Sequence, residues 1–172
     1  MNTLGLDRSP HSAAYRQLVE VLQADPLLRQ AVRRWITWND QARPPGEPWR
    51  PPADGELPCV ELVPSQAPDA WNGPEGTTAD LALDLIVTVA DANAENAFDL
   101  YHACWRAGYP TDQARHIKIH NLLQAAGMSH FQAVRFEAPD FAPVKDKDLT
   151  RMVAGGKIAL PVDRDFNPNR GA

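Results

Sequence analysis

Residues 78–90 read TADLALDLIVTVA, and this stretch decides the fold. Every odd-numbered position from 79 to 89 is apolar, whereas the even-numbered positions include Thr78, Asp80, Asp84 and Thr88. Because side chains alternate between the two faces of a strand, the pattern predicts one core face and one acidic face. At about 3.3 Å per residue the strand is roughly 40 Å long, about twice the usual length. We therefore expect it to project past its own sheet and to need partners.

A helix is predicted directly after this strand. Asp91 and Asn93 are candidate N-cap residues, and Gly108 with Pro110 beyond it is a typical helix end. Four apolar residues recur between these limits at helical spacing: Ala94, Phe98, Tyr101 and Trp105. The unit is expected to be one long strand with a helix folded back on it.

Two helical stretches are predicted before the strand. Residues 1–11 carry no period and are expected to form a flexible arm. A helix starts near Ser12, and Asp25-Pro26 is a typical cap and first turn for a second helix that runs to about Trp38. Three arginines lie off its apolar stripe, either as a solvated face or as a contact with an acidic partner: Arg29, Arg33 and Arg34.

Two stretches rich in proline and glycine lie between residues 43 and 76. Residues 43–58 hold six prolines and Trp49, which predicts an extended arm. Trp49 favours an arm laid over another surface, because an aromatic ring normally finds a packing partner. A short strand is predicted at Cys59 to Val63, and the second loop carries Trp71.

The C-terminal half is predicted to hold a helix and two strands. Asp112 can cap a helix that Gly127 ends. A strand is expected at 131–138 and a loop at 139–148. A last strand is expected at Arg151 to Val162, with Gly155-Gly156 marking a bulge or a tight bend.

This order of elements predicts one α+β domain over residues 12–162, followed by a mobile tail at 163–172. We expect a mainly antiparallel sheet with helices packed on one face. The predicted core consists of Leu81, Leu83, Leu85, Val87, Phe98, Tyr101, Trp105, Leu122, Val134, Phe136, Ile158 and Leu160.

Composition favours a soluble, cytosolic chain. The net charge of -5 is uneven, because residues 1–50 hold seven arginines and five acids, while acids dominate the rest. That is not the charge distribution of a general nucleic-acid binder. No run of about 18 apolar residues predicts a membrane span. Cys59 and Cys104 have apolar neighbours, so buried free thiols are favoured over a disulfide or a ligand pair.

Catalytic patterns lack support in the sequence, and no cofactor is expected. His116 and His120 stand four residues apart, a spacing at which two imidazoles can share a metal, but surface or half-buried structural histidines are the favoured interpretation. Asp80 and Asp84 lie about 13 Å apart along a strand, too far to hold one metal or one proton. No phosphate-binding loop or nucleophile elbow is present.

Taken together, the elements resemble the tail terminator, or tail completion, proteins of long-tailed bacteriophages. The resemblance covers about residues 12–162 and lies in the order of elements. It includes the Asp25-Pro26 step with the Val32 to Trp35 segment, the proline-rich approach to Leu57 to Val63, the strand Thr78 to Ala90, the helix Asp91 to Trp105 and the two closing strands.

The resemblance implies a small α+β subunit without catalytic residues. Six copies would form a ring in the virion tail or neck, assembled in the host cytoplasm, that caps the tail tube and ends its polymerisation. Its implied partners are its own copies, the tail-tube protein, the head–tail connector or neck protein, and DNA that passes the lumen without specific binding. No membrane is implied. The predicted helix at 112–127 is longer than the resemblance leads us to expect.

The candidate site residues follow from the same interpretation. Interface candidates are Arg29, Arg33, Arg34, Trp49 and Trp71, and channel-lining candidates are Asp80, Asp84 and Asp91.

Two alternatives stay open. The chain is another head–tail adaptor or tail structural subunit, or it is a small metal-assisted enzyme that uses His116 and His120 with an acid from the long strand. The number of subunits in the assembly would distinguish the first alternative from a tail terminator, because a connector forms a twelve-membered ring. Stoichiometric zinc or manganese would favour the second.

Overall fold

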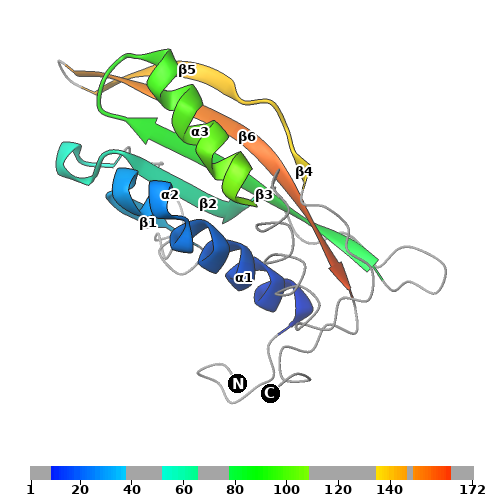
Figure 1. Cartoon of the computed structure of the whole chain (residues 1–172). Coiled ribbons are helices and arrows are strands. Elements are labelled where there is room, and N and C mark those ends of the chain that lie inside the picture. Colours follow the sequence, from blue (N-terminus) through cyan, green and yellow to red (C-terminus); the bar gives the residue numbers. More distant parts are fainter. Residues whose placement is uncertain (1–8, 38–51, 66–77, 109–134, 147–148, 164–172) are drawn as a thin grey trace.

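The computed structural model describes residues 9–37, 52–65, 78–108, 135–146 and 149–163. Within these residues three α-helices pack against one twisted sheet (Figure 1). The helices are α1 (Pro10–Ala24), α2 (Pro26–Ala31) and α3 (Ala94–Gly108), with a short 3-10 helix, η2 (Asp54–Glu56). The strands are β1 (Arg34–Ile36), β2 (Cys59–Pro64), β3 (Thr78–Val89), β4 (Arg135–Phe136), β5 (Asp140–Asp146) and β6 (Leu149–Asp163).

One aspartate joins the first two helices. Asp25 follows the last turn of α1, and its carboxylate accepts hydrogen bonds from the backbone N–H groups of Leu27 at 2.9 Å and Leu28 at 3.2 Å. Pro26 occupies the first turn of α2, where its missing N–H costs nothing. The predicted cap at Asp25-Pro26 is therefore confirmed.

The cap of α3 is Asn93, one of the two predicted residues. Its side-chain oxygen accepts a hydrogen bond from the N–H of Glu95 at 2.9 Å. Asp91 instead accepts a bond from the side-chain amide of Asn96 at 2.9 Å, and its carbonyl oxygen accepts one from Met152 of β6 at 3.0 Å. These bonds fix the turn between β3 and α3.

The sheet is mixed, and the α+β class is confirmed. Its order is β1-β2-β3-β6, and both β4 and β5 pair with the remaining edge of β6. β1 runs parallel to β2, whereas the other pairings among the described strands are antiparallel. β3 pairs with β6 along its whole length, from Thr78 opposite Asp163 to Val89 opposite Met152. β2 pairs with β3 only from Leu83 onward, so the start of β3 extends past β2.

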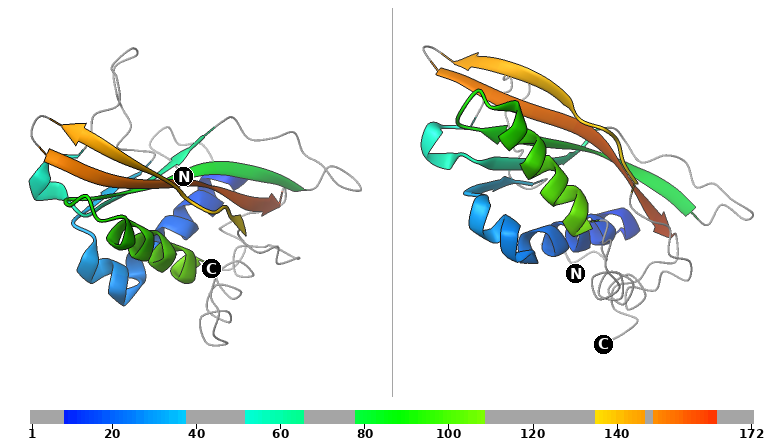
Figure 2. Two further views of the ribbon diagram at one scale, coloured as in Figure 1. Left: turned by 90° about the horizontal axis from the view of Figure 1, so that it is seen from above. Right: turned by 45° about the horizontal axis from the view of Figure 1, so that its top comes forward.

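The main core lies between the sheet and the helices. The odd-numbered residues of β3 from Leu81 to Val89 are buried, as the alternation predicts. They cluster with residues of α1, α2 and α3. In the view from above, the three α-helices lie together on one side of the strands (Figure 2).

The opposite face of the sheet is covered at its β1–β2 side. Leu57, just after η2, packs there with Ile36 and Cys59. β2 is consequently buried on both faces. η2 therefore lies across the sheet from α1 and α3. The expectation that helices pack on one face stays a prediction, because residues 112–127 lie outside the described ranges.

Two segments differ from the expected secondary structure. Residues 34–36 form β1 instead of the end of a helix, because the register with Cys59–Glu61 gives them backbone partners that α2 does not offer. Residues 140–146 form β5 instead of a loop, paired along β6 although Pro143 interrupts them. Proline is tolerated on an edge strand, where one side of the backbone needs no partner.

Two predicted core residues are exposed. Phe98 is 46% and Trp105 is 39% exposed, whereas Tyr101 and Ile158 are buried as predicted. Phe136 is half-buried against the core. The side chains of Leu122, Val134 and Leu160 lie outside the described part of the chain.

No helix in the described ranges is both long and apolar enough to cross a membrane.

Both cysteines are free and buried, as predicted. Burial raises the pKa of the Cys59 thiol to about 12, helped by the Glu61 carboxylate. Burial also raises the pKa of Cys104 to about 12, helped by Asp25. Between their ordinary value of 9.0 and about 12, the thiols ionise only in the unfolded chain, so their contribution to stability falls as pH rises through that window.

We expect neither thiol of the folded chain to react with a disulfide reagent at pH 8 within minutes, because the attacking species is the thiolate. In denaturant, two thiols per chain should react at once. A rapid reaction of the folded chain, followed by absorbance, would show that one thiol is accessible.

Candidate assembly surfaces

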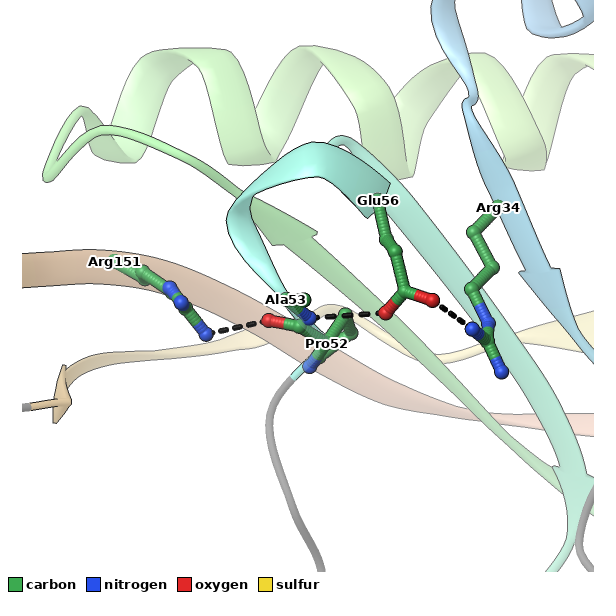
Figure 3. A network of polar contacts seen from close by, with 5 residues as sticks. All are labelled: Arg34, Pro52, Ala53, Glu56 and Arg151. Atoms are coloured by element: carbon green, nitrogen blue, oxygen red, sulfur yellow. Dashed lines mark hydrogen bonds and ion pairs between the residues drawn. The ribbon is translucent and has the colours of Figure 1, made fainter.

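A buried arginine holds the described end of the proline-rich arm. Arg151 of β6 is 3% exposed, and its guanidinium donates to the carbonyl oxygen of Pro52 at 2.6 Å (Figure 3). The same guanidinium donates to a carboxylate oxygen of Asp54, also at 2.6 Å. Hydrogen bonds to a charged group of this kind contribute about 1.5–3 kcal/mol. The link joins residues nearly a hundred positions apart, so it fixes the arm's base to the sheet.

A second ionic contact fixes the base of the arm to β1, at the edge of the sheet. Arg34 of β1 forms an ion pair with Glu56, whose other carboxylate oxygen accepts the N–H of Ala53 at 2.9 Å (Figure 3). The backbone N–H of Arg33 donates to the carbonyl of Pro58 at 2.9 Å. Residues 52–58 are therefore held by their own domain. Trp49, three residues before Pro52, lies outside the described residues, as does Trp71.

The three candidate arginines do not act as one group. Arg34 is paired with Glu56. Arg29 lies in the last turn of α2, and both Arg29 and Arg33 are exposed. Arg29 and Arg33 remain available to a partner surface.

The candidate channel residues are separated. Asp84 is half-buried on the face of β3 that does not meet α1 and α3, and it pairs directly across from Lys157 of β6. Residues opposite each other in a ladder share a face, so Lys157 balances the charge of Asp84. The side chain of Asp80 is outside the described part. Asp91 is exposed at the turn into α3, beyond the end of β3. The sequence pattern missed Lys157 because it comes from another strand.

A continuous row of aromatic rings lies at the surface along α3. Phe98 contacts Phe141 of β5 with ring centroids 6.1 Å apart and stacks on His102 at 6.0 Å. His102 meets Trp105 edge-on at 5.7 Å, and Trp105 stacks on Phe136 of β4 at 6.4 Å. We call these five residues the aromatic row. It crosses from β5 over α3 to β4.

Three members of the aromatic row, Phe98, Trp105 and Phe136, were predicted from the sequence to lie in the core. The buried side of α3 is formed by other residues: Ala97, Leu100, Tyr101, Cys104, Ala107 and Gly108. Phe98, Trp105 and Phe141 are three of the exposed large apolar residues in the described chain. A contiguous exposed apolar patch usually marks an interaction site. Tryptophan in particular is enriched among residues that dominate binding energy.

Metal-ligating side chains do not cluster in the described ranges. No three His, Cys, Asp or Glu side chains within those ranges are placed to hold a metal ion. His116 and His120 fall outside the described ranges.

Comparison with protein-family models and with curated protein sequences found no match to this chain.

Proposed function

We propose that this chain is a structural subunit of a phage tail, a tail terminator that closes into a ring of six copies and joins the tail tube to the head-side neck. The α+β domain and its long central strand agree with the resemblance in the sequence. The single observation that carries the proposal is the aromatic row, because a contiguous exposed apolar patch usually marks a surface that binds a partner.

The anchored arm base supports the same function. Arg151 and Arg34 hold residues 52–58 at two points, so the preceding stretch with Trp49 leaves the sheet from a fixed position. An arm that starts from a fixed position loses less entropy when it binds a neighbour than one that starts from a mobile loop. A ring subunit benefits from this arrangement at every contact.

The ring would let DNA pass without specific binding. Asp80 and Asp84 are the candidate lining, and Lys157 opposite Asp84 makes that stretch mixed in charge. A mixed lining binds phosphate more weakly than a basic one, because each neutralised phosphate needs its own cation. Passage therefore does not require a wholly acidic wall.

Substitution in the aromatic row tests the proposal. Trp105→Asp should weaken assembly at least tenfold in concentration, measured by light scattering, because buried tryptophans at interfaces commonly cost about 2 kcal/mol or more when removed. Arg106→Ala, the next residue on the same helix, is the matched control. Trp105 is 39% exposed, so thermal unfolding of each variant is measured first and assembly is compared at a temperature where both are folded. Unchanged assembly of Trp105→Asp would contradict an interface at this row.

A further inference from the structure

An apolar groove of about 400 Å³ lies between α2 and α3, beside the end of β3. Leu27 and Ala31 line it from α2, and Leu100 and Ala103 line it from α3. Asp91 and Asp99 also line it, and both are exposed, so two carboxylates stand at an apolar hollow. Leu27, which lines the groove, is 57% exposed and so open to a binding partner.

This lining selects the chemistry of an occupant. Among the described residues, the groove offers apolar walls and two carboxylates, and no lysine or arginine lines it. An apolar side chain flanked by cations would complement it, with the ring or aliphatic group in the hollow and the cations toward the aspartates.

The segment after β6 has that chemistry. Residues 164–172 read RDFNPNRGA, with Phe166 as their one aromatic residue and arginines at 164 and 170 on either side of it. The segment carries one acidic side chain, Asp165, against these two cations.

The segment cannot reach the groove of its own chain. β6 ends at Asp163, which pairs with Thr78 at the start of β3, whereas Val89 and Asp91 beside the groove follow the other end of β3. From Thr78 to Val89 the strand runs about 36 Å. Phe166 follows Asp163 by three residues, which span at most about 11 Å when fully extended. A Phe166 that enters the groove must therefore come from another copy.

We propose that the groove between α2 and α3 binds residues 164–172 of a neighbouring copy, with Phe166 in the hollow and the two arginines toward Asp91 and Asp99. The donor segment and the acceptor groove lie at opposite ends of β3, so the contact is head-to-tail. Repeated contacts of this kind close into a ring when the rotation between copies allows it. This inference rests on the proposed ring and names the contact that builds it.

Two variants of the full chain test the contact. Phe166→Ala removes the donor and leaves the groove intact. Leu27→Lys places a cation in the groove and leaves the donor intact, and the exposure of Leu27 lets the domain fold with this change. Each variant alone should need at least tenfold more protein to assemble than the wild type, measured by light scattering. Asn169→Ala is the control within the same segment and should assemble normally.

Mixing the two variants gives the decisive result. The Leu27→Lys variant keeps a functional C-terminal segment, and the Phe166→Ala variant keeps a functional groove. An equimolar mixture should therefore form dimers of one copy of each variant. These dimers should not grow, because their remaining groove and segment are both altered. A mixture that stays monomeric overturns the proposal. Single variants that assemble like the wild type also overturn the proposed contact. If the wild type nevertheless forms six-membered rings, the proposed function stands without this contact.

Other outcomes separate the occupant from the ring. If Trp49→Ala prevents assembly while Phe166→Ala does not, the proline-rich arm is the occupant and the proposal is overturned. If the wild type is a closed oligomer of another size and Phe166→Ala dissociates it into monomers, the result supports the contact. The same result contradicts the six-membered ring of the proposed function.

Discussion

Leu83→Ala is expected to lower the free energy of unfolding by about 2–5 kcal/mol, the range found when a buried leucine is truncated and its cavity stays open. Leu83 is fully buried on the face of β3 that meets the helices. It also marks the position at which β2 begins to pair with β3. The surrounding strands hold the backbone on both sides, so the cavity cannot collapse easily.

Urea unfolding followed by circular dichroism measures this loss. Asp84→Ala is the matched control, because it changes the neighbouring residue on the opposite face. That change should cost less than about 1 kcal/mol, because Asp84 is only half-buried and a partly exposed pairing with Lys157 contributes about 0–1 kcal/mol. Equal losses for the two variants would show that the faces of β3 are assigned the wrong way round.

Gly156→Ala is expected to destabilise the domain by about 1–3 kcal/mol, as overpacking of a filled core does. A Cβ atom at this position would lie 2.2 Å from the hydroxyl oxygen of Tyr101 and 3.2 Å from the carbonyl oxygen of Glu137. That hydroxyl donates a hydrogen bond of 2.9 Å to the same carbonyl. The methyl group therefore has to displace the buried ring of Tyr101 and disturb its hydrogen bond to Glu137.

The adjacent glycine provides the control. A Cβ atom at Gly155 would meet only Ile86, at an ordinary 3.8 Å. Gly155→Ala should be neutral, or stabilising by up to about 1 kcal/mol through the unfolded chain. Adding Tyr101→Phe to Gly156→Ala removes the nearest atom, so the double variant should recover part of the loss. Equal unfolding midpoints for the two single glycine variants would contradict this packing.

The alternation of apolar and polar residues in 78–90 was the most informative sequence pattern for predicting the fold. It predicted the strand, its buried face and its length, because a period of two is a direct consequence of backbone geometry. The Asp25-Pro26 cap was equally readable, since it depends on neighbours in sequence. β1 and β5 were missed because they are short or interrupted by proline, and they exist through pairing with distant strands.

The candidate site was less predictable. α3 carries two apolar stripes, and sequence spacing gave no reason to place Phe98 and Trp105 outside and Ala97 and Cys104 inside. The buried stripe also contains Leu100 and Tyr101, so the choice depends on which side of α3 faces the sheet, and spacing along the helix does not fix that side. Arg151 had one signal, a cation within an apolar strand, but its partners at Pro52 and Asp54 lie far away in sequence. Lys157 was overlooked for the same reason.

The subunit number of the wild-type chain tests the central claim most directly. Light scattering gives the mass of the assembly, and negative-stain imaging gives its symmetry and shows whether its centre is open. The proposed function predicts a closed ring of six copies with an open centre. A monomer at high concentration, or a ring of twelve, would contradict it.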